Sequence, residues 1–258
     1  MKNKKILHII PSISPTRGGP SKAIIEMVAS LRTLGVDAEI ATTNDHGDKT
    51  LDVELNQLIK YNDVPIRFFK RYSPKFNAIR EFAYSKDFKH WIKKNISNYD
   101  IIHIHAIFSF CSTYAMYQAR KQNVSYIVRP IGQLETWSLT QSKQRKSIYL
   151  NIIERHNLAC ANMVHFTATS EKQQALKLIP ELKTSVIPLG INMPTLIDRA
   201  THKMCLHWGL KKNIPTVLFL SRLHPKKGLE LLISALSQLN EIESVSYTHL
   251  TLPTILLV

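Results

Sequence analysis

The sequence has few cysteines and no long apolar run. Its three cysteines, Cys111, Cys160 and Cys205, are odd in number and match no metal-ligand spacing. We therefore expect reduced thiols, as in a cytoplasmic protein, and neither disulfides nor a structural zinc site. No stretch approaches the 18 apolar residues that a membrane-spanning helix needs. The first residues are basic, but they are too short and polar for a signal peptide.

Acidic residues are scarce beside basic ones. Asp and Glu total 19 and Lys and Arg total 34, which gives a formal net charge of +15. This excess favours anionic partners, namely nucleotides, anionic lipid or nucleic acid. The 258 residues, 44% of them apolar, are enough for one large domain or two small ones. Internal repeats and low-complexity segments are absent.

The N-terminal residues predict a βαβ unit. Residues 5–10 form a strand, a loop with Gly18 and Gly19 follows, Ser21 caps a helix, and residues 38–42 form the second strand. The loop lacks the G-x-G-x-x-G fingerprint, which disfavours a dinucleotide site. A glycine pair lets the backbone approach a ligand closely, although an ordinary tight turn is the favoured explanation when the pair is considered alone.

Basic and aromatic residues concentrate in residues 67–94, after a polar stretch at 51–62 that predicts helix or loop. Nine Lys or Arg stand in this segment against two acidic residues, with eight of the chain's 21 aromatic residues. This composition suits the surface of an anionic membrane. It would also suit single-stranded nucleic acid. The alternative that needs no ligand is a helix packed on the core with a solvated basic face.

A buried strand and its exit loop are predicted over residues 99–108. His103 and His105 alternate with isoleucines, so both face the same side of the strand. Two histidines could contribute to a metal site, but no third ligand is evident, and we expect no metal. His105 stands at the carboxyl end of the strand, where α/β sheets meet their ligands. A lone histidine there is nevertheless more often structural.

The stretch Thr216–Ala235 combines a buried strand, a basic loop and an amphipathic helix that begins at Leu229. A loop between a parallel strand and a helix N-terminus is a common anion site. Arg222 and Lys227 add two cations to this loop. The stretch therefore predicts a phosphate or diphosphate site, with a solvated basic turn as the alternative.

The same stretch resembles the nucleotide-binding signature G-R-L-x-x-x-K-G of the retaining family-four glycosyltransferases. Ser221 replaces the first glycine, and Arg222, Leu223, Lys227 and Gly228 match. Three further motifs of that family have counterparts here. They are D-x-x-H-x-H at residues 100–105, a shifted R-G-x-L-x-x-W-x-L at 129–139, and V-I-x-N-G-I-D at 186–192 with two departures.

The resemblance covers roughly residues 4–240 and implies the GT-B architecture, in which a cleft separates two Rossmann-like α/β domains. It implies transfer of a sugar from a nucleotide-sugar to an acceptor with retention of configuration, without a cofactor or a metal. It also implies a role for seven residues. Arg222, Lys227, Gly18 and Gly19 bind the donor diphosphate, His105 is catalytic and contacts the reacting sugar, and Arg129 and Gly132 lie on the acceptor side. For Arg129, the alternative is a surface arginine beside a turn.

The resemblance also divides the chain into domains. We expect an N-terminal Rossmann-like acceptor-side domain at 1–193, a connector at 194–214, and the start of the nucleotide-sugar-binding domain at 215–244. The glutamate pair of the family's second domain is missing, so we expect an inactive, truncated fragment. The peptide VSYTHLTLPT matches ten codons of a sequencing adapter, so we expect residues 245–258 to be an artefactual tail.

The basic surface favours a peripheral enzyme on the inner face of the cell membrane. We expect a lipid-linked acceptor, as in bacterial surface polysaccharide synthesis, membrane contact through residues 67–94, and no nucleic-acid partner. Two rival functions remain. One is another GT-B enzyme, an epimerase or a phosphorylase. The other is a non-catalytic module that binds nucleotide or nucleic acid.

Overall fold

The computed structural model describes residues 4–191, 217–221, 225–238, 247–249 and 255–257. The chain forms two compact units, Met1–Gly190 and Ile191–Val258, and each is described by itself. The expected connector at 194–214 and residue Arg222 lie outside the described residues. Among the helices that the structure describes, none has the length and apolar character needed to cross a membrane.

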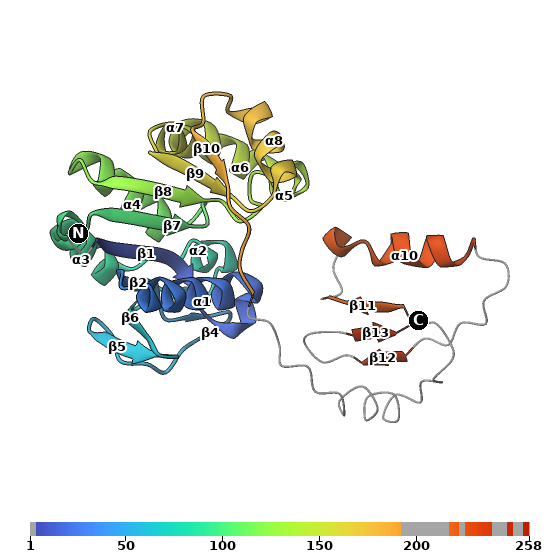
Figure 1. The fold of residues 1–258 in the computed structure, drawn as a ribbon, viewed down its shortest axis with the longest axis horizontal. Helices are drawn as coiled ribbons and strands as arrows, with labels where there is room; N and C mark the ends of the chain where they lie inside the picture. The colour runs from blue at the N-terminus through green and yellow to red at the C-terminus, as the bar shows by residue number, and fades with distance from the viewer. Residues whose placement is uncertain (1–3, 192–216, 222–224, 239–246, 250–254, 258) are drawn as a thin grey trace. The chain divides into compact units, whose positions relative to one another are not determined.

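The first unit is built on an eight-stranded sheet with the order β10-β9-β8-β7-β1-β2-β6-β5 (Figure 1). The strands are β1 (Lys5–Ser12), β2 (Asp37–Thr43), β5 (Leu58–Tyr61), β6 (Val64–Phe69), β7 (Ile101–His105), β8 (Ser125–Arg129), β9 (Met163–Phe166) and β10 (Thr184–Val186). All pairings are parallel except that of β5 with β6. The strand order reverses between β1 and β7, which is where doubly wound sheets bind ligands. The predicted Rossmann-like α/β fold is confirmed.

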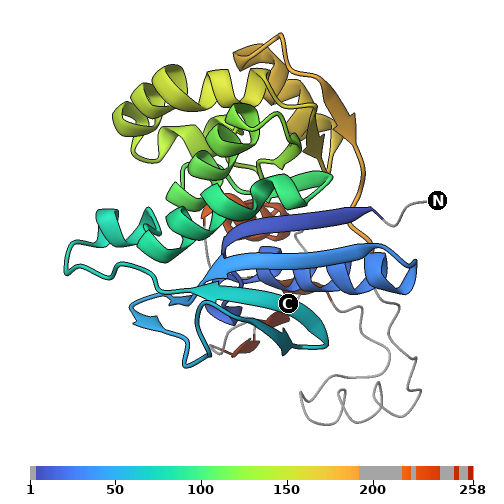
Figure 2. The same cartoon turned by 90° about the vertical axis from the view of Figure 1, so that its left-hand side faces the viewer.

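Helices cover both faces of this sheet (Figure 2). On one face, α1 (Gly19–Thr33) packs Ile24 and Val28 against β2 and β6. On the other, α3 (Lys86–Asn95) and α4 (Phe110–Lys121) join a larger core that also contains Leu7 and Ile104. Because side chains alternate along a strand, Leu7 and Ile9 face α4 whereas His8 lies on the face of α1.

The remaining helices of the first unit are short. They are α2 (Asn77–Glu81), α5 (Thr136–Thr140), α6 (Lys143–Tyr149), α7 (Arg155–Ala159) and α8 (Thr169–Leu178), with the 3-10 turns Pro15–Arg17 and Ile96–Asn98. A π-helical turn, Leu150–Glu154, joins α6 to α7, so residues 143–159 form one helical stretch with a change of winding in its middle.

Three local predictions need correction. Gly18, not Ser21, caps α1, because the helix begins three residues earlier than a cap at Ser21 would place it. Residues 51–62 include strand β5, which pairs with β6 and whose side chains alternate in exposure. Residues 67–94 form the end of β6 and the two helices α2 and α3, with a bend between them.

The second unit contains β11 (Leu218–Leu220), a 3-10 turn (Pro225–Lys227), α10 (Leu229–Leu236), β12 (Tyr247–His249) and β13 (Ile255–Leu257). The predicted strand and the helix from Leu229 are both present. The strand was expected to be parallel, but in the described residues β11 pairs antiparallel with β13, which also pairs antiparallel with β12.

Candidate functional site

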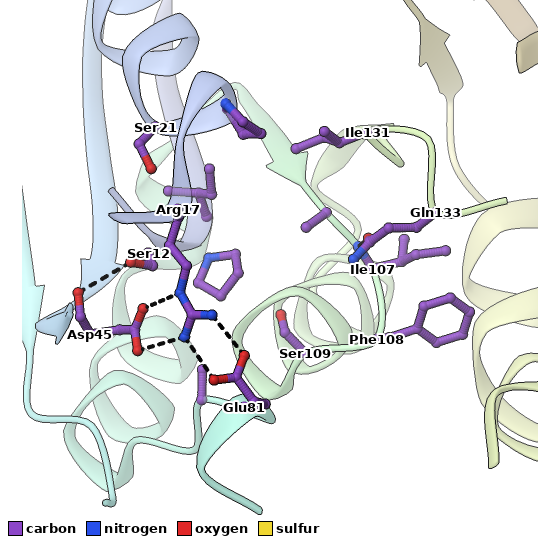
Figure 3. A pocket seen from close by; sticks show the side chains of 15 residues that line it. Ser12, Arg17, Ser21, Asp45, Glu81, Ile107, Phe108, Ser109, Ile131 and Gln133 are labelled. Carbon is purple, nitrogen blue, oxygen red and sulfur yellow. Dashed lines mark hydrogen bonds and ion pairs between the residues drawn. The ribbon is translucent and has the colours of Figure 1, made fainter. Parts of the chain in front are cut away.

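A cavity of about 300 Å³ lies at the carboxyl ends of β1, β7 and β8 (Figure 3). The loops that leave these strands and the turn before α1 form its walls. The lining residues are Ile10, Pro11, Ser12, Arg17, Pro20, Ser21, Asp45, Glu81, Ala83, Ala106, Ile107, Phe108, Ser109, Ile131 and Gln133. Its position is the one at which a parallel α/β sheet exposes loop backbone and polar side chains to a ligand.

One wall of the cavity is an ion-pair network centred on Arg17 (Figure 3). Its guanidinium donates to both oxygens of Asp45, at 2.7 and 2.9 Å, and to both oxygens of Glu81, at 2.8 and 3.0 Å. Burial opposes ionisation of Asp45, but hydrogen bonds, chiefly from Arg17, hold the pKa of this carboxyl below its usual value. The buried Arg71 also bonds to Asp45. Both carboxylates are therefore held in a fixed orientation by Arg17, and their arrangement suits a hydroxyl-rich ligand.

The opposite wall carries strained backbone. Ala106, Phe108 and Ile131 line the cavity with positive φ angles of 70°, 59° and 57°. This left-handed region is costly for residues other than glycine, and most of all for a β-branched one. The side chain of Gln133 accepts a hydrogen bond from the amide of Ile107 at 2.5 Å, which helps to hold the loop after β7. Such strain is typical of functional loops.

Glu154 supports the loop after β7 through hydrogen bonds. It is fully buried and accepts hydrogen bonds from the amide of Phe108 (3.2 Å), Oγ1 of Thr113 (2.6 Å) and Nδ2 of Asn157 (3.2 Å). Burial raises the pKa of this carboxyl, and the three donors offset only part of that effect. Glu154 therefore positions the loop and does not line the cavity.

Histidines from three strands cluster on the α1 face of the sheet. Nδ1 of His8 lies 3.0 Å from Nε2 of His105, and Nδ1 of His165 lies 3.5 Å from Nε2 of His103. Nε2 of His165 donates to the carbonyl of Ile187 at 2.8 Å. Burial lowers the pKa of all four imidazoles, that of His8 to about 3, so they are neutral near pH 7.

His8 is the third potential metal ligand, beside His103 and His105, and the sequence did not reveal it. The ligand nitrogens of His8, His103 and His105 lie within 4.8 Å of one another. Neutral imidazoles are suitable ligands, but the positive charge of the neighbouring Arg129 acts on all three and opposes a cation. The absence of a metal from the site stays a prediction.

The expected residues of the first unit surround the cavity but do not line it. His105 is fully buried and immediately precedes Ala106 in the wall. Arg129 is 1% exposed, so the alternative of a surface arginine is wrong. Gly132 follows Ile131, and its amide donates to Oε1 of Glu171 at 2.7 Å.

The glycine pair flanks the cavity in the same way. Gly18 and Gly19 lie between Arg17 and Pro20, which both belong to the wall. Gly18 has φ 77° and ψ −143°, a conformation open almost only to glycine, whereas Gly19 begins α1 with ordinary geometry. The pair therefore shapes the turn that presents Arg17 to the cavity.

In the second unit, Lys227 is exposed at the end of the 3-10 turn. Gly228 follows with φ 67° and precedes the first residue of α10. This is the strand, turn and helix order that the anion-site prediction requires. The predicted diphosphate role of Lys227 stays a prediction, as does that of Arg222.

Sequence reasoning missed the residues that make up the cavity wall. Arg17, Asp45, Glu81 and Gln133 come from four separate loops or helix ends, and no spacing along the chain connects them. The nearest available signal was the position of Arg17, directly before the glycine pair.

Comparison with known proteins shows the family. The profile of Glycosyltransferase Family 4 matches residues 17–193, more than half of the chain. No curated protein sequence matches the chain. Among solved structures, the chain is similar to sucrose-phosphate synthase from Thermosynechococcus elongatus, with 18% identity and a TM-score of 0.64. That alignment covers 92% of this chain and 60% of the synthase, so the chain spans less than two thirds of its relative.

A weaker likeness links the chain to α,α-trehalose 6-phosphate synthase from Burkholderia multivorans, with 11% identity, a TM-score of 0.44, and coverage of 91% of this chain and 55% of that one. At 18% identity, the match to sucrose-phosphate synthase speaks for the fold alone. The profile match, however, spans seven of the eight strands of the sheet, both helical layers and all the lining residues of the cavity except Ile10, Pro11 and Ser12. The chain belongs to Glycosyltransferase Family 4.

Proposed function

We propose that this chain carries the acceptor-side domain, and the start of the donor-side domain, of a retaining enzyme that moves a sugar from a nucleotide-sugar to an acceptor. The observation that carries the proposal is the cavity at the switch point of the sheet, most of whose lining residues lie in the region that matches Glycosyltransferase Family 4. Its oriented carboxylates and strained loop suit the hydroxyl groups of an acceptor.

The role of each residue follows from the family resemblance and from its position near the end of a strand. Arg222 and Lys227 would stabilise the negative charge that grows on the departing diphosphate. The turn at Gly18 and Gly19 would admit phosphate and acceptor, and His105 would act next to the reacting sugar. Arg129 and Gly132 would serve the acceptor side. The nucleotide-sugar is a substrate, and the proposal uses no resident cofactor or metal.

A transfer assay tests this function. The protein encoded by the uninterrupted source gene is incubated with labelled nucleotide-sugars and candidate acceptors, and the products are identified. Transfer with retained anomeric configuration, measured by nuclear magnetic resonance of the product, supports the proposal. Epimerised nucleotide-sugar, phosphorolysis, or binding without turnover would each favour a rival function. Lys227→Ala should lower transfer at least tenfold, whereas Lys121→Ala, at an exposed helix end, should not.

The expected truncation has its own test. Reading the source DNA across codon 240 shows whether the frame runs on into a second domain with two glutamates eight positions apart. A source sequence that encodes residues 245–258 and then stops would contradict the expected adapter tail. In either case, we predict that residues 1–258 alone transfer no sugar, and detectable transfer by them would contradict that prediction.

We also propose a lipid-linked acceptor reached from the inner face of the membrane, in bacterial surface polysaccharide synthesis. Much of the basic and aromatic segment 67–94 is core, since Phe68, Phe69 and Phe88 are buried. Two of its exposed apolar side chains lie at α2, where Phe76 is 74% exposed and Ile79 is 49% exposed, and other exposed lysines of the segment lie on α3. Exposed Lys70, Tyr72 and Lys75 stand beside them. Apolar side chains among lysines suit an anionic lipid surface.

Liposome sedimentation tests the membrane contact. The chain should sediment with anionic vesicles and not with neutral ones, and Phe76→Ser should weaken this severalfold. Leu34→Ser is the matched control, because Leu34 is 79% exposed at the far end of α1. Equal sedimentation with both kinds of vesicle, or an equal effect of the two substitutions, would reject the proposed surface.

A further inference from the structure

Arg129 is a buried arginine, and two of its three guanidinium nitrogens lack a hydrogen-bond partner among the described residues. Its Nε and Nη1 bond to nothing in the described part of the chain, although the residue is 1% exposed. Arg71, 2% exposed, shows the usual arrangement, because it bonds to Asp45 and to the carbonyls of Gly47 and Lys49, both at 3.0 Å. Buried charged donors normally find acceptors, so an unpaired guanidinium requires an explanation.

The strand register places Arg129 beside the histidine cluster. In the pairing of β7 with β8, His105 is the partner of Arg129. Ile104 and Val128 belong to the core on the opposite face, so these two polar side chains share the face of α1. After burial itself, the charge of Arg129 is among the causes that lower the pKa of His8 and His165, which confirms that the guanidinium lies near the cluster.

The carboxylate that opposes the charge of Arg129 already accepts hydrogen bonds from other groups. Glu171 is the carboxylate whose field acts on Arg129. Its two oxygens accept hydrogen bonds from the amide of Gly132 at 2.7 Å and from the amide and hydroxyl of Thr167 at 3.2 and 3.3 Å. Glu171 therefore holds the loop after β8, while Nε and Nη1 of Arg129 stay unpaired in the described part of the chain.

The pair of His8 and His105 adds a further unpaired donor. The bond between Nδ1 of His8 and Nε2 of His105 uses one nitrogen of each ring. The other nitrogens, Nε2 of His8 and Nδ1 of His105, have no partner among the described residues. Since both rings are neutral, one of these two nitrogens must carry a hydrogen in either tautomeric arrangement. The face thus presents unpaired donors of Arg129 and of one imidazole.

We propose that Arg129, with the His8–His105 pair beside it, is a preformed subsite for an anionic group of a substrate, a phosphate or a carboxylate. A cationic donor set of this kind forms short, charge-assisted hydrogen bonds to oxyanions. Arg129 ends β8, next to the loop that lines the cavity, so a ligand group there is adjacent to the proposed acceptor. The assignment to a sugar substrate depends on the proposed transferase function, whereas anion binding itself does not.

The test uses thermal unfolding and calorimetric titration of the 258-residue chain at pH 7.5 and constant ionic strength. The probes are inorganic phosphate and glucuronate, with chloride as the reference. All proteins carry Lys227→Ala, which removes the other predicted phosphate-binding group. We expect one of the two probes to bind and to raise Tm, and Arg129→Met to weaken that binding at least tenfold. A response to phosphate indicates a phosphorylated substrate, and a response to glucuronate an acidic sugar.

Stability without a ligand separates this role from a structural one. Arg129→Met should keep or raise Tm, because it removes a buried, unpaired charge. Arg71→Met is the matched control, and it should lower Tm and retain anion binding.

The proposal is overturned if neither probe binds, if Arg129→Met binds as tightly as its parent, or if it lowers Tm as far as Arg71→Met. Stabilisation by zinc chloride that His8→Asn abolishes would also overturn it, in favour of a metal site. Anion binding by the 258-residue chain, together with no sugar transfer by the protein encoded by the uninterrupted source gene, would refute the transferase function and leave the subsite in place.

Discussion

Nδ1 of His8 lies 3.0 Å from Nε2 of His105, on neighbouring parallel strands whose residues are 97 positions apart in the sequence. Each ring is fully buried, and each supplies the other with a hydrogen-bond partner. The pair links β1 to β7 at the switch point of the sheet, one residue before the strained loop of the cavity. Its protonation should therefore affect both the stability of the fold and the geometry of the site.

We predict that stability falls as the pH is lowered from 7.5 to 5. The folded protein holds the pKa of His8 at about 3, below the value near 6.5 of an unfolded histidine. Between these values the unfolded chain binds a proton that the folded chain does not, so protonation favours unfolding. At pH 5 this costs about 2 kcal/mol of unfolding free energy for each histidine kept fully neutral. Urea unfolding at both pH values measures the loss.

His8→Asn isolates the contribution of one ring. The amide of asparagine can replace Nδ1 as partner of His105, but it does not titrate. The loss of stability between pH 7.5 and 5 should be smaller by about 2 kcal/mol in this variant, whatever its stability at pH 7.5. An unchanged loss would show that His8 is already protonated in the folded protein.

Asp45→Asn should destabilise the protein strongly. Asp45 pairs with Arg17 and with Arg71, whose side chain is fully buried. Removing the carboxylate leaves a buried cation without its counter-charge, which costs about 3–5 kcal/mol. Asp48→Asn is the control, because Asp48 pairs with Arg80 while 87% exposed and should cost at most about 1 kcal/mol. Similar urea midpoints for both variants would contradict the burial of the network.

The described thiols should differ sharply in reactivity. Cys111 is fully buried in α4, and burial raises its pKa well above the usual value, whereas Cys160 is exposed after α7. In a Cys205→Ser chain, a disulfide reagent should therefore modify one thiol rapidly and the second only on unfolding. Cys160→Ser in that background should remove the rapid phase, and a rapid phase that survives it would place Cys111 at the surface.

The sequence predicted the fold well because local patterns encode it. Apolar runs such as those of β1 and β2 marked the central strands within one or two residues. Family motifs located His105 and Gly132 near the cavity. The pairings that complete the site depend on register and on distant loops, which no local pattern contains. His8 meets His105 only because β1 pairs with β7, and Arg17 reaches Glu81 across 64 residues.

The two glycines before α1 should respond oppositely to substitution by alanine. Gly18 holds φ 77° and ψ −143°, so Gly18→Ala forces an alanine into a conformation almost reserved for glycine, at a cost of about 1–3 kcal/mol. Gly19 is the first residue of α1, and an added Cβ meets nothing within 4 Å. Gly19→Ala should therefore be neutral or stabilise by up to about 1 kcal/mol, because alanine restricts the unfolded chain.

Urea unfolding of both variants, beside the parent chain, measures this contrast. If the pair serves chiefly to let backbone approach a ligand, both substitutions should also weaken substrate binding, since each adds a methyl group at the turn. If Gly18 serves chiefly to turn the chain, only Gly18→Ala should weaken substrate binding, because it displaces Arg17 from Asp45 and Glu81. Equal stability of the two variants would show that the turn before α1 does not require the left-handed conformation seen at Gly18.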